Sequence, residues 1–377
     1  MNELKLEKTK TYEFQIEKLS FGGMGIAHHQ GMVFFIDQTA PGDLVLAKVT
    51  KLKKRYGIAD LMEILKPGLE RRTPPCKIAN LCGGCNWQHL SYKEQISQKE
   101  LILSEILNKS KINFPENTKV ISSPEFYYRN RIQVRNYNQK FGFLKKGTHQ
   151  IADTKECLIA EEGLFENVLS QKDLPENRLN KLEVYKLDGD FKVSVNKGHA
   201  EESGFSQVND VQNTKMISWV QENIEGLQYE RFIDLYCGNG NFVRQLRLPE
   251  IKDKIGVEQN PSAIQKAKSL DLKNEIHWRQ GDVIDHIRDL GDFSEDLVLI
   301  DPPRIGAAKD FLSLLIEQKI SKLVYISCDP NTFVRDLEFI ESLGVEISVL
   351  SLSGLDMFPQ THHIEVVSVL EIKRRTI

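Results

Sequence analysis

Four cysteines are spaced in a way that suits a metal centre. Three of them lie within ten residues in the segment "CKIANLCGGC", with the spacing C-x5-C-x2-C, and the fourth follows about seventy residues later: Cys76, Cys82, Cys85 and Cys157. Clustered cysteines in a reducing compartment more often bind a metal or catalyse a reaction than form disulfides. Four thiolates can hold either a zinc ion or a [4Fe–4S] cluster, and the spacing alone does not separate the two.

A second group of candidate residues follows apolar segments that are typical of buried parallel strands. The segment "FIDLYCGNGNF" leads into a glycine turn, "KIGVEQN" contains Glu258 at its end, and "RQGD" ends at Asp282. A glycine turn lets backbone N–H groups approach a ligand, and an acidic residue after the next strand can accept hydrogen bonds from ribose hydroxyls. Asp282 could bind an adenine amine, although any of these carboxylates could also be merely solvated. Because the full G-x-G-x-x-G pattern is absent, S-adenosylmethionine is favoured over a dinucleotide.

Two further apolar segments end in groups that could do covalent chemistry. "LVLIDPPRIG" places Asp301 before two prolines, which direct it into the strand-end crevice, and "KLVYISCDP" ends its apolar run at Cys328. A thiolate that adds to C6 of a uracil makes C5 nucleophilic enough to take a methyl group from a sulfonium. A base must then remove the C5 proton, and Glu365 is the candidate, with His362 and His363 as rivals. Taken alone, Cys328 could be an ordinary core residue.

These residues require a sheet whose strands end at one edge. From about residue 216, apolar strands alternate with helical stretches, which predicts a doubly wound, Rossmann-like α/β domain over residues 216–377. Residues 1–62 contain short alternating segments separated by Gly and Pro turns, which predicts a small antiparallel β-barrel, OB-like. Its basic strand suits an RNA-binding surface, although many such barrels are only structural. The intervening residues 63–215 contain the four cysteines and predict a central α+β domain with the metal centre and RNA contacts.

Composition limits the class of protein. A chain of 377 residues is expected to form two or three domains, and a net charge of -3 argues against a globally basic nucleic-acid-binding protein. Two basic segments, "KVTKLKKR" and "YYRNRIQVR", could still contact RNA. No apolar run approaches the length of a membrane span, and the charged start "MNELKLEKTK" lacks the apolar part of a signal peptide. We therefore expect a cytoplasmic protein without membrane contacts.

Four segments carry a resemblance to a known family. "DLYCGNGNF", "DPPR", "SCDP" and "THHIE", in this order, resemble the uracil-C5 RNA methyltransferases, the 5-methyluridine synthases. The amino-terminal barrel is similar to the TRAM domain of some members, and "FSQVN" resembles the segment whose glutamine lies between cofactor and target base. One departure is Asp329, where many members have Asn. The resemblance implies a nucleophile at Cys328, a base at Glu365, and S-adenosylmethionine contacts at Gln207, Tyr236, Asn241, Glu258, Asp282 and Asp301.

The resemblance also bears on the cysteines and on the substrate. "CGGCNWQHLSY" is similar to the cluster-bearing branch of the family, which implies a structural [4Fe–4S] cluster at the four cysteines rather than zinc. The resemblance implies an RNA substrate, with 23S ribosomal RNA favoured over the T-loop of transfer RNA. We also expect the protein to be a monomer. Two other classes stay open: an amino-group methyltransferase, which would normally have an aromatic residue where Arg304 stands, and a non-catalytic RNA-binding protein.

Overall fold

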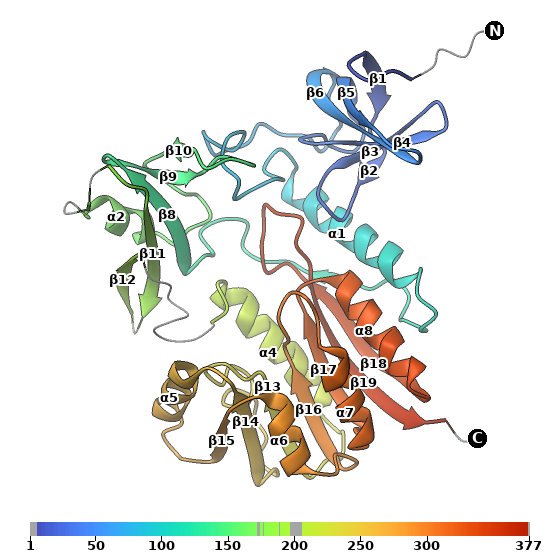
Figure 1. Cartoon of the computed structure of the whole chain (residues 1–377), viewed down its shortest axis with the longest axis vertical. Coiled ribbons are helices and arrows are strands. Elements are labelled where there is room, and N and C mark those ends of the chain that lie inside the picture. The colour runs from blue at the N-terminus through green and yellow to red at the C-terminus, as the bar shows by residue number, and fades with distance from the viewer. Residues whose placement is uncertain (1–5, 172–173, 176, 188, 197–205, 376–377) are drawn as a thin grey trace.

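Three β-sheets form the framework of the protein. The structure, a computed structural model, describes residues 6–171, 174–175, 177–187, 189–196 and 206–375. A six-stranded sheet comes first along the chain, a five-stranded sheet follows, and an eight-stranded sheet carries the carboxyl-terminal half. In Figure 1 the six-stranded sheet lies at the upper right, the five-stranded sheet at the upper left and the eight-stranded sheet below them.

The six-stranded sheet curves around a small apolar core. Its order is β1-β5-β6-β4-β3-β2, with β1 (Thr11–Gln15), β2 (Lys18–Leu19), β3 (Gly25–His29), β4 (Met32–Ile36), β5 (Leu44–Leu52) and β6 (Tyr56–Lys66). The alternating sequence turns one face inward, where Phe14 and Phe34 pack with their ring centroids 4.8 Å apart. The prediction of a wholly antiparallel barrel was wrong in one pairing. Because β5 carries the chain back, β6 arrives beside β4 in the same direction, and these two strands are parallel.

The five-stranded sheet is antiparallel and stands apart from the other two in Figure 1. Its order is β10-β9-β8-β11-β12, with β8 (Arg131–Tyr137), β9 (Lys140–Leu144), β10 (Ile151–Asp153), β11 (Asn180–Leu187) and β12 (Asp190–Val195). Helix α2 (Leu164–Leu169) covers one face by burying Leu164, Phe165 and Val168. The cysteine segment lies beside this sheet, since Cys82 bridges to Lys145 just after β9.

The eight-stranded sheet has the order β15-β14-β13-β16-β17-β19-β18-β7. Its parallel strands are β13 (Arg231–Leu235), β14 (Asp253–Glu258), β15 (Ile276–Gln280), β16 (Asp296–Ile300) and β17 (Lys322–Ser327). Next to β17, the strand β19 (Glu365–Arg374) is antiparallel, and β18 (Val345–Leu355) pairs antiparallel with β19. The edge strand β7 (Val120–Ile121) runs parallel to β18. The predicted doubly wound α/β fold is therefore confirmed.

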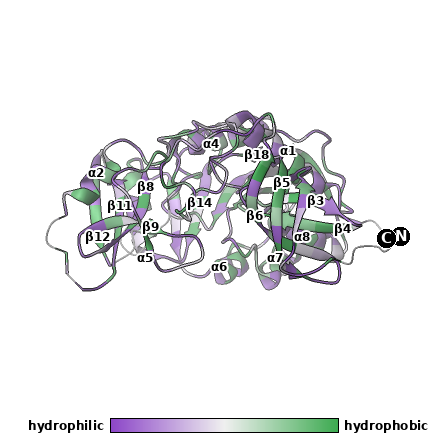
Figure 2. Cartoon of the chain, turned by 90° about the horizontal axis from the view of Figure 1, so that it is seen from above, coloured by the Kyte–Doolittle hydropathy of each residue, from purple (hydrophilic) through white to green (hydrophobic). Residues whose placement is uncertain are grey.

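Helices cover both faces of this sheet. On one face lie α6 (Val283–Leu290), α7 (Lys309–Glu317), α8 (Pro330–Ser342) and α1 (Tyr92–Leu107), and α4 (Asp210–Ile224) packs on the other. Helix α5 (Pro261–Leu270) contacts β14 and β15. Helix α6 buries Val283, Ile287 and Leu290, a spacing that puts one apolar stripe on the sheet. Figure 2 shows both hydrophobic and hydrophilic residues on α6, as this stripe requires.

Segments from the expected central domain join the eight-stranded sheet. Helix α1 contacts α8 and β7, and β7 supplies the edge strand, so residues 92–121 pack with the carboxyl-terminal half. The expected boundary after residue 215 falls inside α4. The division into 1–62, 63–215 and 216–377 stays a prediction. Within the described ranges, no helix combines the length and the apolar character needed to cross a membrane.

Candidate active site

The parallel part of the eight-stranded sheet reverses its strand order between β13 and β16. From β13 the chain moves outward through β14 and β15, and it then returns to the other side of β13 to form β16 and β17. In open α/β sheets the loops that follow two such strands diverge, so a ligand-binding crevice is expected at the carboxyl ends of β13 and β16.

The turn after β13 lies at this edge and has an unusual backbone conformation. Tyr236, Gly238 and Gly240 all have positive φ angles, of 69°, 56° and 81°. Gly240 also has no room for a side chain, because an added Cβ would lie 2.5 Å from the ring of Trp278. A tyrosine in the left-handed region is uncommon and is a feature of functional turns. Gly238 thus has the positive φ that close approach of a ligand to the backbone needs, whereas Trp278 occupies the space at Gly240, and ligand contact at this turn stays a prediction.

Two of the predicted cofactor residues also shape this turn. The Glu258 carboxylate accepts hydrogen bonds from the N–H groups of Gly238, at 3.1 Å, and Asn260, at 2.7 Å. Each carboxylate oxygen retains a second acceptor site, so ribose hydroxyls could still be bound. Tyr236 packs on Phe311, with ring centroids 5.4 Å apart, and burial raises the pKa of its hydroxyl to about 12.

Two other predicted cofactor residues, Asp282 and Asn241, form hydrogen bonds within the protein. Asp282 caps helix α6 by accepting from Ile284 N–H. Asn241 exchanges amide hydrogen bonds with Asn213 of α4, at 2.8 and 2.9 Å. The sequence did not indicate this pairing, which fixes the orientation of the Asn241 side chain.

The two predicted residues Gln207 and Asp301 meet across the crevice. Gln207 Nε2 donates to Asp301 Oδ2 at 3.4 Å, although the two residues are 94 positions apart. Phe205, which begins the "FSQVN" segment, lies outside the described residues. The loop that carries Gln207 is held by Asn130, whose side-chain amide donates to the Gln207 carbonyl at 3.0 Å.

Asp301, Cys328 and Glu365 lie at the ends of three adjacent strands. Asp301 follows β16 and Cys328 follows β17, two parallel neighbours. Glu365 begins β19, which pairs with β17 so that Ser327 lies opposite Val366. Because β19 runs antiparallel, its first residue lies at the same edge as the ends of β16 and β17. Sheet register therefore brings the two predicted catalytic residues, Cys328 and Glu365, to the same edge as the predicted cofactor residue Asp301.

Burial and mutual charge determine the protonation of this group. Burial raises the pKa of the Cys328 thiol to about 12; the Glu365 and Asp301 charges also raise it, and Arg304 lowers it. Burial, and then the Asp301 charge, raise the pKa of Glu365, and Arg304 again acts in the opposite direction. Burial likewise raises the pKa of Asp301. Such shifts concentrate at catalytic sites.

The two histidines that compete with Glu365 for the role of base are less basic than usual. Burial, and then the neighbouring His362, lower the pKa of His363 to about 4. The two rings lie 4.4 Å apart, and His362 Nδ1 is hydrogen-bonded to Asn86 Nδ2 at 2.7 Å. A histidine with so low a pKa binds a proton more weakly than Glu365, so the pKa shifts favour the carboxylate, and its role as base stays a prediction.

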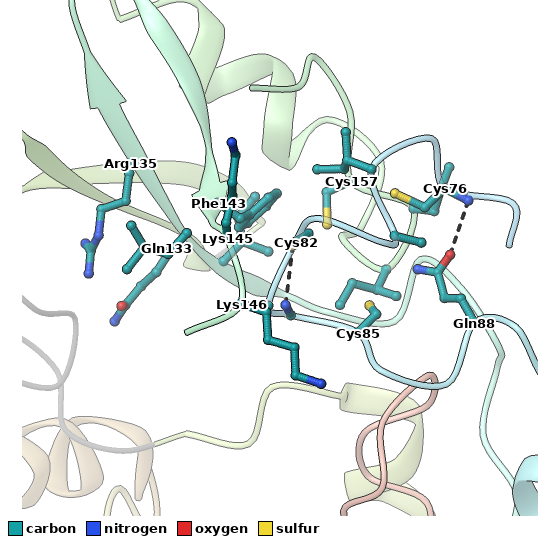
Figure 3. A pocket seen from close by; sticks show the side chains of 18 of the residues that line it. Cys76, Cys82, Cys85, Gln88, Gln133, Arg135, Phe143, Lys145, Lys146 and Cys157 are labelled. Atoms are coloured by element: carbon teal, nitrogen blue, oxygen red, sulfur yellow. Dashed lines mark hydrogen bonds between the residues drawn. The ribbon is translucent and has the colours of Figure 1, made fainter. Parts of the chain in front are cut away.

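The four predicted metal ligands line one cavity of about 540 Å³ beside the five-stranded sheet. Figure 3 shows the side chains of Cys76, Cys85 and Cys157 pointing toward a common space from two separate loops. Burial, together with the nearby Cys157, Cys82 and Cys76, raises the pKa of Cys85 to about 12, against the effect of a hydrogen bond from Gln88. Burial also raises the pKa of Cys157, to about 11.

The donor set suits a cationic group, because buried thiols with raised pKa values become thiolates when a metal supplies positive charge. However, in the part of the chain that the structure describes, no three His, Cys, Asp or Glu side chains are arranged to hold a metal ion. The metal centre therefore stays a prediction, and the iron–sulfur domain is not shown by the fold.

Arg304 is a site residue whose role the sequence did not indicate. It is exposed, and its charge lowers the pKa of Cys328, Glu365 and His363. The sequence placed it only as the residue after Asp301-Pro302-Pro303. Its position close to Asp301 was the feature of the sequence that could have indicated a role in the site.

Two segments of the chain match known protein families. Residues 191–374 match the family described as tRNA (Uracil-5-)-methyltransferase, and residues 5–62 match the TRAM domain. An uncharacterized RNA methyltransferase of Bdellovibrio bacteriovorus is 36% identical over 372 residues, covering 96% of this chain and 95% of that protein. An uncharacterized RNA methyltransferase of Aquifex aeolicus is 32% identical, covering 97% of this chain and all of that protein.

Two further proteins align over almost the whole chain. The 23S rRNA (uracil(1939)-C(5))-methyltransferase RlmD of Mannheimia succiniciproducens is 27% identical, with 95% of each chain covered. The crystal structure of the Pyrococcus abyssi tRNA (uracil-54, C5)-methyltransferase with S-adenosyl-L-homocysteine is similar with a TM-score of 0.70 and 22% identity, covering 95% of this chain and 99% of that one. This second likeness shows the fold. The chain belongs to the uracil-5 methyltransferase family, the S-adenosylmethionine-dependent uracil-C5 RNA methyltransferases, and carries a TRAM domain at its amino-terminal end.

Proposed function

We propose that this chain methylates C5 of a uridine in RNA through a covalent intermediate, with Cys328 as nucleophile and Glu365 as base. The observation that carries this proposal is the meeting of Asp301, Cys328 and Glu365 at three adjacent strand ends. An amino-group methyltransferase would use Asp301 but would leave the other two residues without a role.

The Cys328 thiol gives its proton to water, and the thiolate sulfur forms a bond to C6 of the uracil, which leaves negative charge on C5 and O4. C5 then forms a bond to the methyl carbon of S-adenosylmethionine as the bond from that carbon to the sulfonium breaks, which releases S-adenosylhomocysteine. The Glu365 carboxylate removes the remaining C5 proton, the C5–C6 double bond returns, and the thiolate leaves.

The side chains around this group have roles in binding and orientation. Cofactor contacts are proposed at Gln207, Tyr236, Asn241, Glu258, Asp282 and Asp301; Gln207 donates to Asp301, and the other five lie at or shortly after the carboxyl ends of parallel strands. Arg304 stabilises the thiolate, because its positive charge lowers the pKa of Cys328. The Gln207 hydrogen bond directs Asp301 toward the place where methyl donor and target base meet.

Trapping on RNA that contains 5-fluorouridine tests the covalent mechanism. Fluorine cannot leave as a cation, so the wild-type protein should stall as a methylated protein–RNA adduct that survives denaturing electrophoresis. Cys328→Ala should form no adduct and should bind S-adenosylmethionine as the wild type does, because the thiol acts on the uracil. An adduct in Cys328→Ala, or residual turnover within a factor of ten of wild type, would contradict the proposal.

We propose 23S ribosomal RNA as the substrate. This rests on the RlmD protein of Mannheimia succiniciproducens, which aligns over 95% of both chains, and on the TRAM domain as an RNA-binding unit. Mapping of 5-methyluridine in cells that lack the protein tests it: one 23S position should lose its methyl group. Loss of the mark from transfer RNA alone would assign the enzyme to the T-loop instead.

We further propose that Cys76, Cys82, Cys85 and Cys157 hold a [4Fe–4S] cluster. When bound, the cluster would supply iron–thiolate bonds that join the cysteine loop to the segment after β10. Methyl transfer from a sulfonium involves no electron transfer, so the proposed role of the cluster is to stabilise the fold. Protein purified without oxygen should contain about four iron and four sulfide per chain. Stoichiometric zinc without sulfide would contradict this assignment and leave the methyltransferase assignment intact.

A further inference from the structure

The segment that leads into Glu365 is held mainly by residues from distant parts of the chain. This segment, residues 356–364 between β18 and β19, is called the catalytic turn below. It contains His362 and His363 and ends at the proposed base. Within it, Gln360 is fully buried and has a positive φ of 68°, a conformation that requires support from its surroundings.

The backbone carbonyl of Gln360 holds the cysteine loop. It accepts hydrogen bonds from the N–H groups of both Asn86 and Trp87, each at 3.0 Å. Asn86 directly follows Cys85, and its side chain also binds His362. The loop that carries three of the four cysteines thus contacts the catalytic turn directly, through two main-chain hydrogen bonds and the Asn86 side chain.

The side chain of Gln360 connects the turn to three more elements. Its Oε1 accepts from Gln95 of α1, at 3.0 Å, and from Arg72, at 3.3 Å. Its Nε2 donates to the backbone oxygen of Glu125, at 3.3 Å, and to the Glu125 carboxylate, at 3.2 Å. Gln95 completes the pairing, because its Oε1 accepts from the Gln360 backbone N–H at 2.9 Å.

Gln95 also binds the cysteine loop directly. Its Nε2 donates to the Trp87 carbonyl at 3.2 Å, and the side chain is fully buried. Gln95 and Gln360 therefore form a buried pair that contacts both the cysteine loop and the catalytic turn. Buried polar groups that are fully hydrogen-bonded keep one arrangement of the elements they join.

We propose that Gln95 and Gln360 are positioning residues that place Glu365 for removal of the C5 proton, with the cysteine loop as the support of the catalytic turn. This rests on the proposed function, in which Glu365 is the base. A small displacement of a catalytic group can reduce its rate by a factor on the order of 100. Loss of the pair should therefore slow proton removal while addition and methyl transfer continue.

Helix α1 offers a matched control. Gln98 lies one turn from Gln95 and is also buried, with 6% of its surface exposed. Its Oε1 accepts from Leu19 N–H at 2.9 Å, so it joins α1 to the six-stranded sheet and not to the catalytic turn. Gln95→Ala and Gln98→Ala each remove one buried glutamine from the same helix face, and a merely structural effect should be similar in both.

The experiment compares Gln95→Ala, Gln98→Ala and Gln360→Gly, with ordinary RNA and excess S-adenosylmethionine. Glycine is used at position 360 because it adopts a positive φ without strain. In Gln95→Ala and Gln360→Gly we expect kcat to fall about 10- to 100-fold. The KM for S-adenosylmethionine should stay the same, and a methylated covalent adduct should accumulate. Gln98→Ala should keep the wild-type kcat and show no adduct.

Two results separate the inference from the proposed function. If Glu365→Gln accumulates the adduct but Gln95→Ala and Gln360→Gly turn over like Gln98→Ala, the positioning role is wrong and the base assignment holds. If Glu365→Gln itself turns over without an adduct, the proposed function fails first. A fall in thermal stability of Gln95→Ala with unchanged kcat in the folded fraction would show a structural role only, and would overturn the inference.

Discussion

Lys99→Met should strongly destabilise the protein, because Lys99 forms a fully buried ion pair that anchors the catalytic turn. Lys99 Nζ lies 2.5 Å from Asp356 Oδ1, and neither side chain is exposed. The ammonium also donates to the Phe358 carbonyl at 3.3 Å. After the substitution, the Asp356 carboxylate would keep the Tyr92 hydroxyl, at 2.8 Å, as a donor but no counter-charge.

The expected cost follows from the desolvation of the remaining charge. Removing one partner of a buried pair typically destabilises a protein by about 3–5 kcal/mol. Burial lowers the pKa of Lys99, although Asp356 acts in the opposite direction. Buried ion pairs add little net stability in general, because desolvation offsets their attraction. The double variant Lys99→Met with Asp356→Asn should therefore recover most of the loss, since Asn is neutral and can still accept from Tyr92.

Urea unfolding measures this difference. Tryptophan fluorescence should report it well, because Lys99 Nζ lies 5.7 Å from the ring of Trp87. Far-UV circular dichroism should give the same transition if unfolding is two-state. Lys119→Met is the control, since Lys119 pairs with Glu100 while 74% exposed, and it should change stability by less than about 1 kcal/mol. A loss below about 1 kcal/mol in Lys99→Met would refute the reasoning.

Three further predictions follow from the site and its supports. Glu365→Gln should accumulate a methylated covalent adduct on ordinary RNA, seen by denaturing electrophoresis, because addition and methyl transfer precede the base's step; turnover without adduct would assign the base elsewhere. Burial lowers the pKa of His89 from 6.5 to about 4, so as the pH falls the imidazole is protonated in the unfolded chain at a higher pH than in the folded protein. The free energy of unfolding should therefore fall by about 3 kcal/mol between pH 6.5 and pH 4. His89→Gln should flatten that pH dependence in urea unfolding. Cys157→Ser should remove iron and lower stability by several kcal/mol, on the order of a long-loop cross-link, while S-adenosylmethionine affinity stays unchanged; unchanged iron content would exclude Cys157 as a ligand.

The sequence by itself determined the strand ends that make up the site. Asp301 and Cys328 each follow an apolar run, and Glu365 precedes one. In a doubly wound sheet, the ends of such runs meet at one edge because the parallel strands share a direction. Local patterns therefore predicted which side chains face the crevice, and they also predicted the cysteine spacing and the alternating strands at the amino-terminal end.

Only the tertiary structure decided how these parts are joined. The parallel pairing of β4 with β6 and the addition of β7 beside β18 depend on which strands lie side by side, and periodicity does not encode this. Lys99 and Asp356 are 257 positions apart, and Gln95 and Gln360 are 265 apart. Each of these residues taken alone looks like an ordinary polar surface residue. Burial in a shared interface gives them their partners, because a polar group removed from water must find its hydrogen bonds within the fold.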